Sequence, residues 1–149
     1  MFEDLLVVLD GGEASERIVG WIGRLCRASG AQARLLVVRE LEGTVSRGAR
    51  PVAFTSQLED SARLESLAYL EGVATRLETA GIRVSAEVRF GSPVDAVLDA
   101  ARESGATLVA LTAPGRAGRR GAMDRLAHEL LHRAPMAVLV ARARDQRAA

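Results

Sequence analysis

Lysine and asparagine are absent from this chain of 149 residues, and all 20 of its basic residues are arginine. Without lysine, the chain has neither the phosphate-binding lysine of a P-loop nor a lysine that forms a Schiff base, which excludes P-loop kinases and lysine-dependent aldolases. Neither sign of charge is in excess, because 20 basic and 19 acidic residues leave a formal net charge of +1. We therefore expect no binding to nucleic acid or to an anionic membrane through overall charge.

Cysteine and long apolar runs are also scarce. Cys26 is the single cysteine, so no internal disulfide can form, and we expect a buried thiol in a reducing compartment. No apolar run approaches the length of a membrane span, and the opening MFEDLLVVLD has an acidic residue where a signal peptide needs positive charge. The sequence predicts a cytoplasmic protein with one compact domain.

Apolar runs and amphipathic stretches alternate along the chain, which is typical of an α/β protein. The run 5–9 is apolar throughout and favours a strand buried on both faces of a parallel sheet. Residues 82–90 alternate apolar and polar side chains, which predicts an edge strand with one wet face. The predicted strands are 5–9, 33–38, 82–90, 107–111 and 136–141, and the predicted helices are 16–29, 58–80, 93–104 and 124–133. We expect a mostly parallel five-stranded sheet with helices on both faces.

Local signals predict the ends and the inner faces of these helices. Ser15 and Ser92 are predicted N-caps, and Gly30, Gly81 and Gly105 are predicted to end helices. Two apolar helix faces are assigned to the core, namely Leu64, Leu67, Leu70, Ala74 and Leu77, and Leu126, Ala127, Leu130, Leu131 and Ala134. Residues 39–57 lack periodicity and predict a long loop, either a lid over a site or a spacer, and 143–149 are expected to be a C-terminal tail.

The stretch 107–141 favours a ligand site more strongly than any other part of the sequence. It combines a buried strand, a loop rich in glycine and arginine, a helix and a second buried strand, so the first N–H groups of a helix lie beside a strand end. Four arginines, Arg116, Arg119, Arg120 and Arg125, could bind an anion there. A solvated basic loop is the alternative interpretation.

The segment from His128 to His132 matches the HExxH pattern of zinc metalloproteases, and Asp124 lies one helical turn earlier. The apolar stripe of the same helix turns both histidines toward solvent, where no pocket can exclude water. We therefore expect no protease and no built metal site, and only adventitious metal binding by the two histidines stays open. No Ser, His and Asp set has a recognisable spacing, so the sequence predicts no catalytic residue.

Three segments together resemble the universal stress protein family over nearly the whole chain. They are LVVLDGGEASE at 6–16, VRFGSPVDAVLDAARESGATLVAL at 88–111 and LLHRAPMAVLVA at 130–141. The resemblance implies a domain over 1–142 with a Rossmann-like, nucleotide alpha-hydrolase-like fold and strand order 3-2-1-4-5. In such sheets ligands bind where the strand order reverses, which lies between the first and fourth strands.

Nucleotide-binding members of this family carry Gly, two residues, Gly, nine residues, and then Gly followed by Ser or Thr. In this sequence Thr112 stands at the first glycine and Gly115 at the second, the longer gap is one residue shorter, and Asp124-Arg125 replaces the final pair. A carboxylate repels a triphosphate and can itself cap the helix, and Pro114 removes an N–H donor. These departures imply that ATP binding is lost or weakened.

The resemblance also implies positions around an adenine nucleotide. Asp10 matches the acidic residue beside the ribose, and Val38 and Leu111 match positions of the adenine pocket. Each has an ordinary structural alternative, a turn cap for Asp10 and core packing for the other two. The candidate nucleotide-binding residues are Asp10, Gly11, Val38, Leu111, Thr112, Gly115, Arg116 and Arg125.

Two functions follow from the resemblance, and a small-molecule carrier that uses the same crevice is a third alternative. The first is a non-enzymatic stress-response regulator with lost or weakened ATP binding, which acts as a homodimer and contacts an unidentified protein partner. Residues 137–141 are apolar throughout and are expected at a sheet edge, where they can pair with a second copy of the strand. The second is a switch that binds ATP or another adenine nucleotide, with slow hydrolysis, through Asp10 and the arginine cluster.

Overall fold

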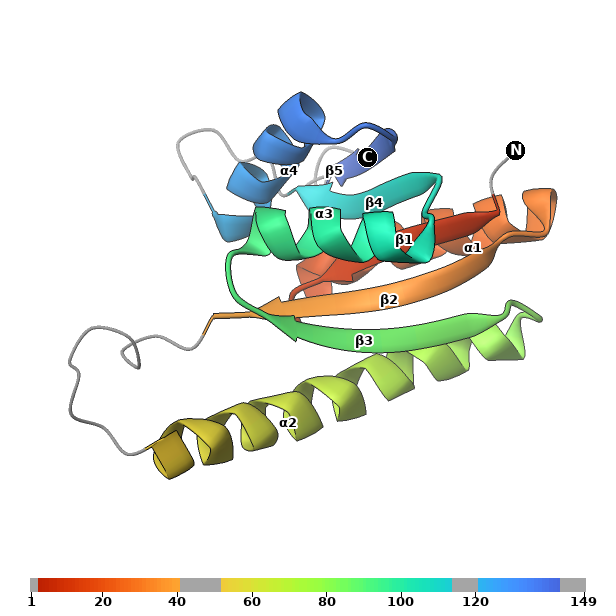
Figure 1. Ribbon diagram of the computed structural model, residues 1–149. Coiled ribbons are helices and arrows are strands. Elements are labelled where there is room, and N and C mark those ends of the chain that lie inside the picture. The colour runs from red at the N-terminus through yellow and green to blue at the C-terminus, as the bar shows by residue number, and fades with distance from the viewer. Residues whose placement is uncertain (1–2, 41–51, 114–120, 143–149) are drawn as a thin grey trace, which may run out of the picture.

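The computed structural model describes residues 3–40, 52–113 and 121–142, with the side chains of the helix that starts at 52 described from residue 56 onward. A central sheet is covered by two helices on each face (Figure 1). Its strands are β1 (Asp4–Leu9), β2 (Gln32–Arg39), β3 (Val84–Phe90), β4 (Leu108–Ala113) and β5 (Ala137–Arg142). The helices are the 3-10 turn η1 (Glu13–Glu16), α1 (Arg17–Ser29), α2 (Val52–Thr79), α3 (Pro93–Ser104) and α4 (Ala122–Arg133). The predicted alternation of strands and helices is confirmed.

The five strands form one parallel sheet in the order β3-β2-β1-β4-β5. This is the predicted order, with the third and fifth strands at the two edges. The central strand β1 is buried on both faces, as its continuous apolar run predicts, because helices cover both sides of it. Leu5, Val7 and Leu9 pack against α1 and α2, whereas Leu6 and Val8 pack against α3 and α4.

Three of the predicted helix ends are confirmed by backbone geometry. Gly30 and Gly105 end α1 and α3 in the left-handed conformation, with φ angles of 75° and 68°. Gly81, with φ of 86°, follows α2 and donates its N–H to the carbonyl of Glu78. Ser92 stands at the N-cap of α3 before Pro93, as predicted, although its side chain makes no capping hydrogen bond.

The predicted N-cap role of Ser15 is wrong. The chain passes through the 3-10 turn η1 before α1 begins at Arg17, so Ser15 lies inside that turn. Its buried hydroxyl donates to the carbonyl of Gly12 at 2.9 Å and accepts the N–H of Asp10 at 3.2 Å. Ser15 therefore closes the turn after β1.

The predicted start and inner face of α2 need correction. The helix begins at Val52 rather than at residue 58, and Leu64 and Leu67 are 70% and 37% exposed. The buried face of α2 contains Leu70 and Leu77, which are seven residues apart, together with Val73. Three residues fall about 60° short of a full helical turn, so side chains spaced by three residues move steadily around the helix. The leucines at 64, 67 and 70 are spaced in this way, and the first two therefore lie off the buried face. Leu131 of α4, also assigned to the core, is exposed on its helix.

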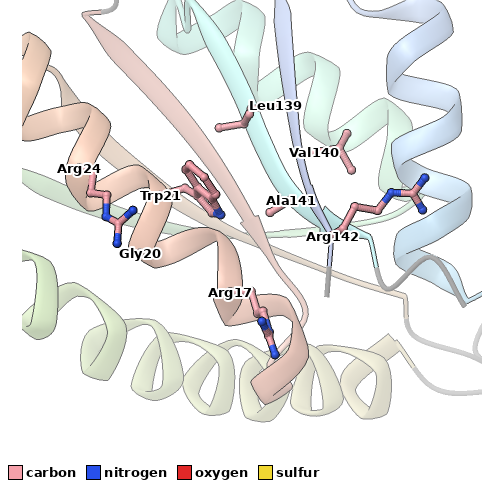
Figure 2. Close-up of a pocket in the computed structure, with 8 residues that line it drawn as sticks. All are labelled: Arg17, Gly20, Trp21, Arg24, Leu139, Val140, Ala141 and Arg142. Carbon is pink, nitrogen blue, oxygen red and sulfur yellow. The ribbon is translucent and has the colours of Figure 1, made fainter. Parts of the chain in front are cut away.

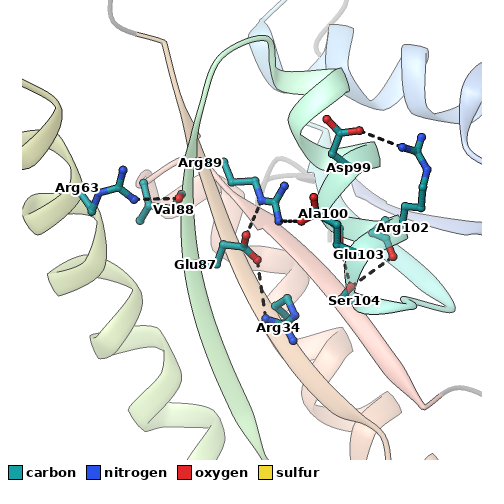
Figure 3. Close-up of polar contacts among 11 residues, drawn as sticks. Arg34, Arg63, Glu87, Val88, Arg89, Asp99, Ala100, Arg102, Glu103 and Ser104 are labelled. Atoms are coloured by element: carbon teal, nitrogen blue, oxygen red, sulfur yellow. Dashed lines mark hydrogen bonds and ion pairs between the residues drawn. The ribbon is translucent and has the colours of Figure 1, made fainter. Parts of the chain in front are cut away.

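The edge strand β3 carries charge on its α3 face, as the alternating sequence predicts. Glu87 pairs with Arg89 on the same strand, and Arg89 also pairs with Glu103 of α3 (Figure 3). Arg34 of β2 lies 3.8 Å from the other oxygen of Glu87. The guanidinium of Arg89 lowers the pKa of the Glu103 carboxyl. Charges on an edge strand hinder further strand pairing, so β3 is a protected edge.

Candidate functional site

The candidate crevice lies where the strand order reverses, at the carboxyl ends of β1 and β4. The sheet register pairs Leu9 with Val37 and Val8 with Leu111. Asp10, which follows Leu9, and Val38, which follows Val37, therefore stand at the same level of the sheet. The structure thus brings candidate residues from three separate segments to one edge, as the resemblance implied.

Asp10 is exposed immediately after β1 and organises the turn that follows. Its Oδ1 accepts the N–H of Gly12 at 2.8 Å. Gly11 between them has φ of +90°, a left-handed conformation that favours glycine. A side chain at Gly12 would place its Cβ 3.2 Å from the same Asp10 oxygen, so the turn is closely fitted. The turn-cap alternative for Asp10 is therefore realised, with the carboxylate just past the carboxyl end of β1.

Thr112 has a structural role that the sequence did not reveal. The side chain is fully buried, and its hydroxyl donates to the carbonyl of Ser15 at 2.9 Å. The same hydroxyl oxygen accepts the N–H of Ile18 at 3.0 Å. The first N–H groups of a helix lack partners within it, so β4 supplies a cap to α1 from across the fold. A polar residue in a buried strand is the signal that such a bond exists.

Val38 and Leu111 face α3 and α4. Leu111 is fully buried in the core on that side, and Val38 is half-buried against the same core. Met123, from the first turn of α4, belongs to this cluster as well. The core alternative therefore holds for Leu111, while Val38 is only partly buried.

The start of α4 contributes the remaining described part of the crevice. The N-cap residue is Gly121, which has no side chain to cap the helix, and Asp124 lies in the first turn. The Asp124 Oδ2 lies 3.5 Å from the point that a Cβ on Gly121 would occupy, so the carboxylate folds back over the helix start. Arg125 is exposed on the next position. Of the other candidates, Gly115, Arg116, Arg119 and Arg120 lie outside the described residues, as does Pro114.

His128 and His132 are both exposed on α4, as their place opposite the apolar stripe predicts. Their ring centroids are 4.6 Å apart, and Nδ1 of His132 lies 2.9 Å from the carbonyl oxygen of His128. Among the residues that the structure describes, no group of three or more His, Cys, Asp or Glu side chains is arranged to hold a metal ion.

A polar cluster that the sequence did not indicate lies where α2 passes the turn after β1. The hydroxyl of Tyr69 donates to Oε2 of Glu16 at 3.1 Å, and Arg76 pairs with Oε1 of the same carboxylate. Burial, together with the negative charge of Glu16, raises the pKa of Tyr69 to about 12. The residues are 53 and 60 positions apart from Glu16, so no local pattern predicts the cluster.

A hollow lies on the other side of α1 from this cluster, between α1 and the edge strand β5 (Figure 2). It has a volume of about 810 Å³. Its lining consists of Arg17, Gly20, Trp21 and Arg24 of α1 and Leu139, Val140, Ala141 and Arg142 of β5. We call it the β5 groove. Within the described ranges, none of the helices has the length and apolar character needed to cross a membrane.

A parallel sheet in the order 3-2-1-4-5, with a turn-forming aspartate at the reversal point, defines a doubly wound, Rossmann-like α/β protein. The model of the universal stress protein family matches residues 1–142, and this chain belongs to that family. Among curated proteins, none matches the sequence.

Solved structures share the fold at low sequence identity. The hypothetical protein MJ0577 is 17% identical with a TM-score of 0.82, over 98% of this chain and 99% of that one. A universal stress protein in complex with cAMP is 20% identical with a TM-score of 0.67, over 96% and 98% of the two chains. A universal stress protein from Archaeoglobus fulgidus in complex with dAMP is 15% identical with a TM-score of 0.62, over 94% and 97%.

Proposed function

We propose that this member of the universal stress protein family is a non-enzymatic regulator that has lost, or greatly weakened, ATP binding and acts as a homodimer toward a protein partner. The crevice between β1 and β4 is then an inherited feature of the fold. Signalling passes through surfaces rather than through nucleotide turnover.

The observation that carries this proposal is the position of Asp124. Its carboxylate lies over the start of α4, where the helix dipole and the first backbone N–H groups of the helix would otherwise attract a phosphate. Two like charges about 4 Å apart repel by about 1 to 4 kcal/mol between bulk water and a protein surface. Thr112 adds support, because its hydroxyl is bonded to the start of α1 at a position where nucleotide-binding members carry glycine.

The two sheet edges support a homodimer through β5. The β3 edge carries the Glu87 and Arg89 charges, whereas the described side chains from 138 to 140 are apolar and half-buried. Among the described strands, β5 pairs with β4 alone, so within that part of the chain its outer edge presents N–H and C=O groups without a strand partner. Light scattering over a concentration series tests this part, and a monomer at every concentration would contradict it.

A thermal denaturation series with ATP, AMP and cAMP tests the nucleotide part. A ligand at 100 times its dissociation constant stabilises a protein by about 2.7 kcal/mol. For a chain of this size that corresponds to a rise in Tm of roughly 5 to 10 °C. We expect no rise at millimolar nucleotide, and a rise of that size with any of the three would overturn the loss of binding.

An adenine-nucleotide switch is the second candidate, favoured by the exposed carboxylate of Asp10 at the level of Val38 and by the cAMP and dAMP complexes of two relatives. If it is correct, the thermal series shows saturable stabilisation, and slow phosphate release accompanies ATP. Asp10→Asn is the informative variant, because an amide oxygen can still accept the Gly12 N–H while the charge is lost. The switch would then lose nucleotide affinity without loss of folding.

A further inference from the structure

The two histidines of this chain stand together on α4. His128 and His132 are the only histidines in the sequence, and both are exposed, one helical turn apart. Side chains at positions i and i+4 lie on the same face of a helix. Their ring centroids are 4.6 Å apart, and the ring planes are inclined by 46°. Because imidazole is the commonest metal ligand in proteins, this geometry decides whether a single ion can contact both rings.

The backbone holds the His132 ring in one orientation. Its Nδ1 lies 2.9 Å from the carbonyl oxygen of His128, and a carbonyl can only accept a hydrogen bond, so Nδ1 carries the proton. In the neutral ring the lone pair is therefore on Nε2. Histidines that bind metals usually donate their other ring N–H to an acceptor of this kind, which fixes the tautomer and the orientation of the ring. His132 is thus set in a tautomer that can bind a metal ion.

The separation of the rings indicates which ions fit. A metal–imidazole bond of about 2.1 Å places the ion roughly 3.2 Å from each ring centroid. Two such ligands at a right angle have centroids about 4.5 Å apart, whereas the tetrahedral angle requires about 5.2 Å. The observed 4.6 Å matches the right angle. Right angles belong to square-planar and octahedral ions such as Cu²⁺ and Ni²⁺, and the tetrahedral angle belongs to Zn²⁺.

The carboxylates of the HExxH segment are directed away from the two rings. Glu129 lies 3.8 Å from the guanidinium of Arg133, which also bonds Asp95 of α3 at 3.1 Å. Asp124 folds back toward Gly121 at the start of the helix. A catalytic zinc site needs three protein ligands, and the described residues offer no such group here. The pair is therefore suited to a two-ligand site, with water in the remaining positions around the ion.

We propose that His128 and His132 chelate a Cu²⁺ ion on the surface of α4. Cu²⁺ is favoured over other ions of right-angle geometry because a given nitrogen site binds it most tightly among the divalent first-row metals. The position on the helix adds to this preference, since His132 lies in the last turn of α4, where the helix dipole favours positive charge. The site uses none of the candidate crevice residues, so it does not depend on the function proposed above.

Calorimetric titration of the full chain with a copper(II) salt, in a buffer that does not bind metals, tests the proposal. We expect saturation at one Cu²⁺ per chain, with an affinity about tenfold or more above that for Zn²⁺. Electron paramagnetic resonance of the complex should show two imidazole nitrogens on the ion. His128→Gln and His132→Gln should each weaken binding by about tenfold or more, because a single imidazole cannot chelate.

Two further variants control for histidine content and for copper bound elsewhere. His132→Gln combined with Glu129→His keeps two histidines on α4, but neighbouring residues are about 100° apart around a helix. This variant should bind Cu²⁺ no more tightly than a variant with one histidine. The double variant His128→Gln/His132→Gln measures the copper held by other groups of the chain, such as the N-terminal amine.

Three results would overturn the proposal. If the parent chain bound Cu²⁺ no more tightly than the double variant, there would be no copper site on α4. If the parent and the variant with neighbouring histidines had the same affinity, the two rings would act singly and not as a chelating pair. If Zn²⁺ bound more tightly than Cu²⁺, the right-angle geometry inferred from the ring separation would be wrong.

Discussion

Replacement of Thr112 by valine removes one hydroxyl that bonds two backbone groups of a distant segment. Valine has almost the same shape, so packing against the fully buried surroundings is kept while the bonds to the Ser15 carbonyl and the Ile18 N–H are lost. A buried group left without its partner costs about 1 to 3 kcal/mol. Since one replacement affects two backbone groups, we expect a loss of about 2 to 3 kcal/mol in the free energy of unfolding.

Chemical denaturation monitored by circular dichroism measures this loss, and a Tm lower by roughly 4 to 12 °C should accompany it. Thr112→Ser is the control, because it keeps the hydroxyl and loses only a methyl group, which costs about 1 kcal/mol. Hydrogen exchange adds local detail, since the Ile18 amide should exchange faster in the valine variant. If Thr112→Val were as stable as the parent and more stable than Thr112→Ser, the capping of α1 by β4 would be refuted.

Three further predictions concern packing and titration. Leu70→Ala should lower the free energy of unfolding by about 2 to 5 kcal/mol, because Leu70 is fully buried. Leu64→Ala, at an exposed position of the same helix, should change it by less than about 0.5 kcal/mol. Equal losses in the two variants would contradict the assigned buried face of α2. Tyr69, the single tyrosine, should titrate with a pKa of about 12 when its absorbance is followed, and Glu16→Gln should lower that pKa. Because the folded pKa lies above the ordinary tyrosine value of about 10, the stability that Tyr69 confers below pH 10 is lost as the pH rises toward 12. Cys26 is buried with a raised pKa, so a thiol reagent should react with it rapidly only after unfolding, and fast reaction with the folded chain would contradict its burial.

The fold was largely predictable because its strongest signals are local. The apolar run of β1 reflects burial on both faces, and the glycines at 30 and 105 end helices because few other residues adopt their backbone angles. The inner face of α2 was harder to predict, since the leucines of that helix occupy both buried and exposed positions. Only contact with the sheet separates Leu70 from Leu64.

The candidate site was predictable in position and less so in detail. The order of the segments placed Asp10 and Val38 at one sheet edge, because parallel strands present their carboxyl ends together. The bonds of Thr112 join residues 94 and 97 positions apart, so no pattern within a short window reveals them. No sequence pattern indicated that Trp21 of α1 would lie beside the β5 edge, because the two elements come together only in the fold.

Calorimetric titration with ATP, in the parent protein and in Asp124→Ser, is the decisive measurement for the loss of nucleotide binding. We expect no saturable heat for the parent at millimolar ATP. We expect the variant to bind ATP about tenfold more tightly than the parent, because the carboxylate over the start of α4 is replaced by a neutral hydroxyl. Saturable micromolar binding of ATP by the parent protein would show that the Asp124 carboxylate does not prevent nucleotide binding.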